Sequence, residues 1–199
     1  MTSKDDDTLP DRVKVTDISA LSDHHYILRR AAFQYRRSDG VWQDNVRESY
    51  DIGDGAAVLP IDEAKDKVVL VRQFRWPAFE HGYRRLLTEA IAGKLDGDTP
   101  EACVIKESLE EAGLTITSPR RVFHCFMSPG AVTERLSLFL ANYDSGQTRH
   151  SGGGFADEGE DIEVLELSLR EALDLVRHGE IVDAKTIILL QHAALERLG

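Results

Sequence analysis

The sequence predicts an α+β protein in which a mixed α/β/α sandwich follows a small N-terminal β-meander. Strand-like segments come first, then one helix, more strands and finally two helices, an order typical of a sheet with helices packed on its faces. The 199 residues are enough for a compact domain with a sizeable core and a small extra subdomain. We expect the meander in residues 1–53 and the main domain in residues 54–199.

The meander is predicted from two strand-like segments and the turn between them. Residues 26–35, YILRRAAFQY, have the composition of a strand, and SDG at residues 38–40 is typical of a hairpin turn. Residues 41–50, VWQDNVRESY, return as a second strand. The polar residues 1–10 are expected to fray.

The main domain is predicted to continue with strands and to end with two helices. An acidic turn at residues 62–66 and a Gly-rich loop at residues 145–161 separate neighbouring strands. Ser168 and Glu171 have the spacing of a capping box at the start of the first C-terminal helix. The strands are expected at residues 55–61, 67–74, 121–127, 135–143 and 162–167, a further extended segment at 83–93, and the two helices at 169–179 and 184–198.

An acidic segment in the middle of the chain predicts a helix over about residues 100–112. Asp98 or Thr99 can cap its N-terminus, and Pro100 suits the first helical turn. Gly113 suits the left-handed position that commonly ends a helix.

Three glutamates of this helix, Glu107, Glu110 and Glu111, fall on one side of it. At these spacings each like-charge pair costs about 0.2–0.5 kcal/mol, and the C-terminal end of a helix disfavours anions. One interpretation is an exposed acidic face, and the other is a bound cation. Carboxylates together with a backbone carbonyl near Ala92, where the preceding strand ends, are hard oxygen ligands that suit Mg²⁺ or Mn²⁺ rather than zinc.

Composition limits the classes of partner. The formal net charge is −11, which argues against binding to a nucleic-acid backbone but allows a small phosphorylated substrate whose charge a metal neutralises. Two cysteines do not make a disulfide framework. The N-terminus lacks the apolar stretch of a signal peptide, and no apolar run approaches the ~20 residues that cross a bilayer. We therefore expect a cytoplasmic protein that binds neither nucleic acid nor membrane.

The segment at residues 93–114 resembles the Nudix box, whose pattern is Gly-x5-Glu-x7-Arg-Glu-(apolar)-x-Glu-Glu-x-Gly-(apolar). The chain keeps the three glutamates and the glycine that follows them. It departs from the pattern at Asp98, which stands one residue early in place of the first glutamate, at Lys106 in place of arginine and at Ser108 in place of an apolar residue. None of these departures affects the glutamates that the family uses around its metals.

Outside the box the chain resembles one branch of this family, the bacterial GDP-mannose hydrolases, which lie near the ADP-ribose pyrophosphatases. The resemblance covers about residues 22–190 and is carried by the segments VRQFR, MSPGAVTE, EDIEVLEL and GEIVDAKTIILL. It implies a Nudix-type α/β/α sandwich. It also implies that Glu107 and Glu111, with the carbonyl of Ala92, bind Mg²⁺ or Mn²⁺, and that Glu110 has a catalytic, orienting role.

A second acidic cluster, FADEGEDIE, follows three glycines at residues 152–154. Taken alone, it is as well explained by a solvated acidic loop. The resemblance implies instead that Glu158 is the base that activates the attacking water and that Glu160 is a further metal ligand. The glycines would let this loop close over the metals.

Substrate-binding residues are expected outside the box. A guanidinium matches phosphate oxygens in a bidentate way, so Arg75 and Arg72 of VRQFR are candidates, and the resemblance favours Arg75. Arg47, from the N-terminal region, is a further candidate. Pro129 lies in a loop that borders the sugar in relatives, although a structural turn explains it equally well.

The implied activity is Mg²⁺-dependent hydrolysis of the diphosphate bond of a nucleoside diphosphate sugar, with GDP-mannose giving GMP and mannose 1-phosphate. ADP-ribose is the alternative substrate. A catalytically silent nucleotide-sugar sensor and a generic acidic interaction protein are alternatives of other classes, which a test for turnover with Mg²⁺ would separate. We also expect a homodimer built partly through residues 26–50, because a two-stranded unit alone is marginally stable in water.

Overall fold

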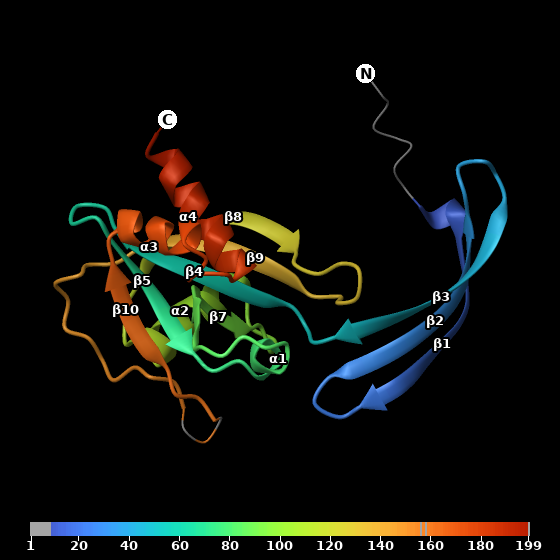
Figure 1. The fold of residues 1–199 in the computed structure, drawn as a ribbon, viewed down its shortest axis with the longest axis horizontal. Helices are drawn as coiled ribbons and strands as arrows, with labels where there is room; N and C mark the ends of the chain where they lie inside the picture. The colour runs from blue at the N-terminus through green and yellow to red at the C-terminus, as the bar shows by residue number, and fades with distance from the viewer. Residues whose placement is uncertain (1–8, 156, 158, 199) are drawn as a thin grey trace. The chain divides into compact units, whose positions relative to one another are not determined.

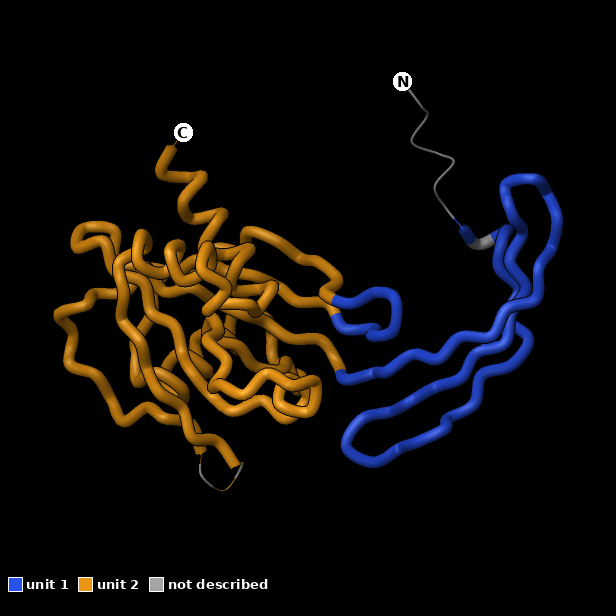
Figure 2. Tube along the Cα trace, in the orientation of Figure 1, with its two compact units in different colours: residues 1–52, 128–134 blue, residues 53–127, 135–199 orange. Residues whose placement is uncertain are grey.

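The computed structural model describes residues 9–155, 157 and 159–198, and the chain divides into two compact units (Figure 1; Figure 2). One unit comprises Met1–Ile52 with Ser128–Glu134, and the other comprises Gly53–Met127 with Arg135–Gly199. The loop Ser128–Glu134 therefore belongs by its contacts to the N-terminal unit, although it lies far along the sequence.

The N-terminal unit is an antiparallel sheet in the order β1-β2-β3, preceded by a short 3-10 helix. The backbone N–H of Arg37 donates to the carbonyl of Val41, and Gly40 has a φ of 83°, which confirms the predicted hairpin turn. The helix spans Pro10–Arg12, and the strands are β1 Val13–Asp23, β2 Ile27–Arg36 and β3 Trp42–Asp51.

The expected two-stranded unit was wrong, because the sequence prediction missed β1. This strand pairs with β2 along its length, but its register shifts between Val15 and Asp17 and again between Ala20 and Ser22. Each bulge adds a residue and so breaks the two-residue alternation on which strand prediction depends. No residue of β1 is buried, so no hydrophobic run marks it either.

The main unit is built on a mixed sheet with the strand path β10-β5-β4-β9-β8, and β6 pairs with β5 while β7 pairs with β4. All residues of β4 are buried, and β4 runs parallel to β9. The strands are β4 Gly55–Asp62, β5 Lys67–Gln73, β6 Leu87–Glu89, β7 Ile91–Lys94, β8 Thr117–Phe126, β9 Arg135–Asn142 and β10 Glu163–Leu167.

Helices cover both faces of this sheet, which confirms the predicted α/β/α sandwich (Figure 1). Val58 and Val71 pack with Val104 of α2 on one face, whereas Leu70 packs with Leu189 of α4 on the other. Within the described residues no helix is long and apolar enough to cross a membrane. The helices are α1 Trp76–Glu80, α2 Pro100–Ala112, α3 Leu169–Arg177 and α4 Ala184–Glu196.

The segment before α2 differs from the expectation of one extended stretch at residues 83–93. It forms two short strands, β6 and β7, which pair with different neighbours in the sheet. The five-residue helix α1 was also missed, because one and a half turns are too short to show a helical period. At the C-terminus, by contrast, the capping box of Ser168 and Glu171 is present as predicted.

Candidate functional site

Helix α2 spans the predicted residues and carries the clustered glutamates. Of the two candidate caps, Asp98 and Thr99, it is Thr99 whose hydroxyl accepts a hydrogen bond from the N–H of Ala102, at 3.2 Å. Gly113 ends the helix with a φ of 64°, which a residue with a side chain rarely adopts. The helix is therefore fixed at both ends, and the positions of its side chains follow from its register.

Glu111 and Glu107 lie where α2 faces the strand β7. Glu111 is only 2% exposed, and its Oε2 accepts a hydrogen bond from the N–H of Ala92 at 3.4 Å. Burial, and next the charge of Glu107, raise the pKa of Glu111 to about 8. Glu107 lies directly over Gly93, where a Cβ atom would come 2.1 Å from its Oε1. A side chain at position 93 would therefore displace the Glu107 carboxylate from its present place.

The remaining box positions lie around this pair. Glu110 is partly exposed, and its carboxylate lies 3.7 Å from the ammonium of Lys106. Ser108, which stands where the family pattern has an apolar residue, is fully buried, and its hydroxyl donates to the carbonyl of Val104 at 2.7 Å. The serine therefore leaves no unsatisfied polar group in the core.

The Gly-rich loop packs against the C-terminal end of α2. The N–H of Gly153 donates to the carbonyl of Glu111 at 2.8 Å, and the N–H of Gly154 donates to that of Glu110 at 3.2 Å. A Cβ atom at Gly152 would lie 2.8 Å from the carbonyl carbon of Ala112. These glycines thus permit close backbone contact with α2, and the loop mobility expected from the sequence stays a prediction.

Glu160 returns from this loop toward the glutamates of α2. Its Oε2 accepts a hydrogen bond from the N–H of Phe155 at 3.0 Å, and it lies against Gly154, where a Cβ atom would come 2.5 Å from the same oxygen. After burial and Glu107, the charge of Glu160 is a further cause that raises the pKa of Glu111. The other predicted loop residue, Glu158, lies outside the described residues.

Arg75 follows β5 and is held by a carboxylate that the sequence analysis did not single out. Its Nε donates to Oε2 of Glu89 at 2.7 Å, and Lys185 donates to Oε1 of the same side chain at 2.5 Å. Burial acts to lower the pKa of Lys185, but the carboxylates of Glu89 and Asp183 outweigh it and raise that pKa. Both Asp183 and Lys185 lie in the segment GEIVDAKTIILL, which carries part of the family resemblance. The sequence analysis assigned no role to either residue.

The other predicted substrate-binding residues are not brought together with the α2 glutamates inside the main unit. Arg72 neighbours Val71, which faces α2, so alternation along the strand places Arg72 on the opposite face, where it pairs with Glu163 at 3.4 Å. Arg47 is exposed on β3 and donates to a backbone carbonyl beside it. Pro129 is exposed in the loop Ser128–Glu134; both belong to the N-terminal unit.

The side chains around Glu111 offer carboxylate oxygens, the ligand type that suits a hard divalent cation. In the part of the chain that the structure describes, no three His, Cys, Asp or Glu side chains are arranged so that together they could hold a metal ion. After burial, the charges of Glu107 and Glu160 both act to raise the pKa of Glu111, while the charge of Arg75 acts to lower it. A hard cation beside these carboxylates would offset their negative charge.

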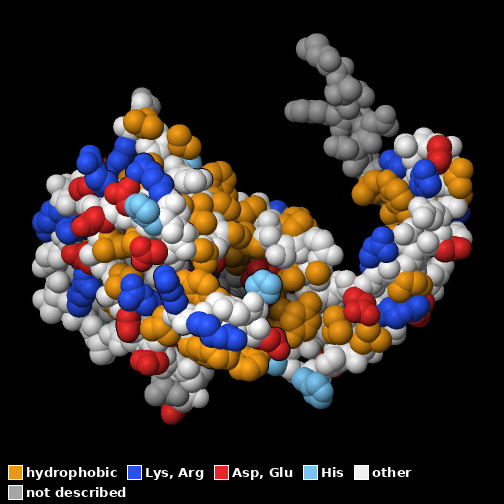
Figure 3. All heavy atoms as spheres, viewed as in Figure 1, with side chains coloured by type: hydrophobic (Ala, Val, Ile, Leu, Met, Phe, Trp, Pro, Cys, Tyr) orange, Lys and Arg blue, Asp and Glu red, His pale blue; other side chains and the backbone are white. Residues whose placement is uncertain are grey.

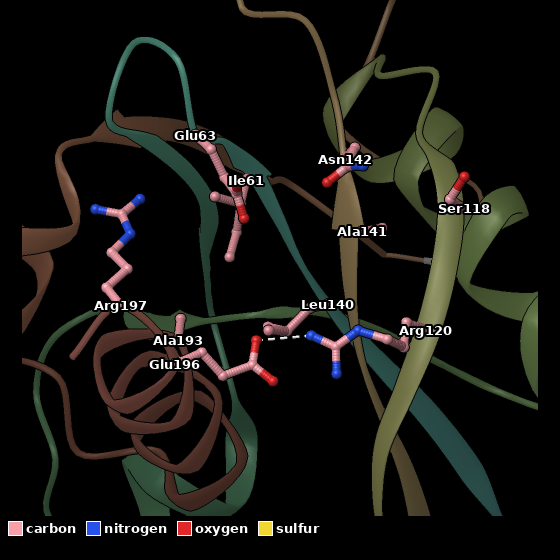
Figure 4. A pocket seen from close by; sticks show the side chains of 10 residues that line it. All are labelled: Ile61, Glu63, Ser118, Arg120, Leu140, Ala141, Asn142, Ala193, Glu196 and Arg197. Carbon is pink, nitrogen blue, oxygen red and sulfur yellow. Dashed lines mark hydrogen bonds and ion pairs between the residues drawn. The ribbon is translucent and has the colours of Figure 1, made fainter. Parts of the chain in front are cut away.

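A separate cavity of about 1040 Å³ lies beside α4 (Figure 4). It is lined in part by Ile61, Leu140 and Ala193, which belong to the core on the α4 face of the sheet. Arg120 and Glu196 on its wall pair with each other at 2.7 Å. None of the predicted site residues lines it, so it offers no alternative to the carboxylate cluster on the α2 face.

Two family models match consecutive parts of the chain. One, described as "NUDIX domain", matches residues 51–187. The other, described as "GDP-mannose pyrophosphatase NudK N-terminal domain", matches residues 12–50.

Curated relatives and solved structures extend this result. A protein of Pectobacterium atrosepticum named GDP-mannose pyrophosphatase is 45% identical over 92% of this chain and 94% of its own. One of the same name from Cronobacter sakazakii is 46% identical over 88% of this chain and 91% of its own. A crystal structure of an ADP compounds hydrolase superposes with a TM-score of 0.70 over 94% of this chain and 96% of that one; at 15% identity it shows the fold alone.

Proposed function

The chain belongs to the Nudix hydrolase family, and on that premise we propose that it hydrolyses the diphosphate bond of GDP-mannose, giving GMP and mannose 1-phosphate. The names of the relatives and the match of the N-terminal family model support this substrate. Nudix hydrolases generally need divalent metal ions, and we propose Mg²⁺, with Mn²⁺ able to replace it.

The observation that carries the reaction class is the carboxylate cluster around buried Glu111. Glu107, Glu111 and Glu160 would hold the metal. The N–H of Ala92 points to Glu111, and because the N–H and C=O of one strand residue point to the same side, its carbonyl is also directed toward α2. When bound, the metal supplies positive charge for the diphosphate oxygens.

The protein's other groups would bind substrate and move the proton. Arg75 keeps its terminal guanidinium nitrogens for the phosphate oxygens, because its Nε is engaged with Glu89. Glu158 is the proposed base that takes a proton from the attacking water, and Glu110 is proposed to orient the ligands from its place beside Lys106. Arg47 and Pro129 are also proposed to bind substrate, and Arg72 is the weaker candidate because of the sheet face on which it lies.

The N-terminal unit is proposed to form a homodimer contact. No residue of β1, β2 or β3 is buried, and Val15, Ile18 and Leu21 are 59%, 61% and 50% exposed. Hydrophobic side chains are visible on the surface of this unit (Figure 3). Neither face of this three-stranded sheet is buried by the other described parts of its own unit. Such a sheet needs another surface to pack against, and a second copy of the chain would supply it.

The experiment that tests the function is a substrate screen with product identification. GDP-mannose, ADP-ribose and other nucleoside diphosphate sugars are incubated with and without Mg²⁺, and products are separated by chromatography. We expect GMP and mannose 1-phosphate, formed fastest from GDP-mannose. Preference for ADP-ribose would overturn the substrate, and absence of Mg²⁺-dependent turnover with every compound would overturn the function.

A further inference from the structure

The start of α4 is tied to the strands β6 and β7 by buried polar contacts. Asp183 caps the helix by accepting from the N–H of Thr186 at 3.0 Å, and the hydroxyl of Thr186 donates back to Asp183 at 2.5 Å. The same hydroxyl accepts a hydrogen bond from the N–H of Ala90 at 2.6 Å, and Thr186 is fully buried. The junction between β6 and β7 is therefore fixed to α4.

Glu89 lies at this junction and is shared between two cations. One carboxylate oxygen accepts from Arg75 at 2.7 Å and the other from Lys185 at 2.5 Å, while the Glu89 side chain is only 4% exposed. Lys185, itself 10% exposed, is also 3.1 Å from Asp183. Rotation of Glu89 would take the carboxylate away from Arg75 and leave buried Lys185 with Asp183 alone, which is unfavourable.

Arg75 differs from Lys185 because part of it reaches solvent. Its side chain is 41% exposed, and only Nε is used in the hydrogen bond to Glu89. A guanidinium is planar with five N–H donors in a fixed fork. Once Glu89 fixes the Nε edge, the plane and direction of the two terminal nitrogens are fixed too.

We propose that Glu89 is a positioning residue: anchored by Lys185, it holds the guanidinium of Arg75 in the orientation that binds a diphosphate. This inference rests on the proposed function for the identity of the substrate. The alternative is that Glu89 only neutralises Lys185 and Arg75 and stabilises the fold.

A double-mutant cycle between Glu89→Gln and Arg75→Gln distinguishes these two roles. Glutamine keeps the shape of the side chain and one oxygen acceptor but lacks the charge that holds both cations. If Glu89 acts through Arg75, Glu89→Gln lowers kcat/KM by about 10–100-fold in the wild-type background, yet by less than about threefold once Arg75 is glutamine. Losses that multiply would overturn the proposal.

Two further variants guard against a folding defect. Glu89→Asp keeps the negative charge but is one methylene shorter, so it cannot reach Arg75 and Lys185 together; it should melt near wild type and still lower kcat/KM in an Arg75-dependent way. Glu163→Gln removes the carboxylate of another partly exposed Arg–Glu pair, on the opposite sheet face, and should change kcat/KM by less than about twofold.

Measuring the same cycle as the Kd of inorganic pyrophosphate separates this inference from the proposed function. We expect Glu89→Gln and Glu89→Asp to weaken pyrophosphate binding only while Arg75 is present, whichever sugar nucleotide proves to be the substrate. Unchanged pyrophosphate affinity in both Glu89 variants would overturn the positioning role even if GDP-mannose is hydrolysed. If no substrate is turned over but the effects of the Glu89 and Arg75 substitutions on pyrophosphate binding still depend on each other, only the proposed function is overturned.

Discussion

Replacing Glu111 by glutamine should separate what this carboxylate contributes to catalysis from what its charge does to the metal-free fold. The side chain is 2% exposed, and burial, followed by the charge of Glu107, raises its pKa from 4.5 to about 8. The folded state therefore binds the proton more tightly than the unfolded state. Stability is highest where both states are protonated and is lost as pH rises through the window from about 4.5 to about 8.

The size of this effect follows from the two pKa values. A shift from 4.5 to about 8 corresponds to roughly 5 kcal/mol in total, of which about 2 kcal/mol is lost between pH 6 and pH 8. The variant Glu111→Gln has no proton to lose at this position. Its free energy of unfolding should lack this decrease, while its turnover should be almost abolished because the charge proposed to bind metal is gone.

The assay is urea unfolding in EDTA at pH 6 and pH 8, with activity measured separately at limiting Mg²⁺. Between these pH values the wild type should lose about 2 kcal/mol more than the variant, or about 4–8 °C in Tm for a chain of this size. Adding Mg²⁺ at pH 8 should restore stability to the wild type and much less to the variant. Equal pH slopes, or near wild-type activity in Glu111→Gln, would refute the reasoning.

Five other substitutions address the loop and the N-terminal unit. Glu158→Gln should lower kcat by about 10²–10⁴-fold with little change in Mg²⁺ affinity, whereas Glu160→Gln should show a defect in activity that high Mg²⁺ partly rescues. The reverse pattern would mean that the two roles are exchanged. Full activity in both variants would mean that another residue is the base. Gly152→Val should lower the free energy of unfolding, measured by urea unfolding, by about 1–3 kcal/mol because its side chain would clash with the end of α2. Gly146→Ala, which meets only flexible side-chain ends, should stay within about 0.5 kcal/mol of the wild type, and equal stability of the two variants would contradict the packing argument. Light scattering at micromolar concentration should give a dimer for the wild type and a monomer for Ile18→Asp, and a wild-type monomer would argue against the proposed dimer contact.

The helix α2 could be predicted from the sequence because its signals are local. Thr99, Pro100 and Gly113 act within a few residues of themselves, and the glutamates take their positions from the helical period. The alternation of β5 likewise contains the information that separates Arg72 from the α2 face, but using it requires knowing which face α2 covers. That choice is made by tertiary packing.

The parts that could not be predicted depend on contacts between distant segments. Glu89 and Lys185 stand 96 positions apart, and nothing in either neighbourhood shows that they share a hydrogen bond. In the sequence, Gly152 suggests only a flexible loop. The structure shows that the backbone of Ala112 lies so close to Gly152 that a side chain there would clash with it. β1 was hidden for a different reason, since its bulges break the pattern that identifies a strand.

The central claim is tested most directly by ³¹P NMR of GDP-mannose incubated with the purified protein and Mg²⁺. We predict that the diphosphate signals are replaced by those of GMP and mannose 1-phosphate, that EDTA stops the reaction, and that Glu111→Gln leaves the diphosphate intact. Persistence of the diphosphate with the wild type and Mg²⁺, or cleavage that continues unchanged in EDTA, would contradict the claim.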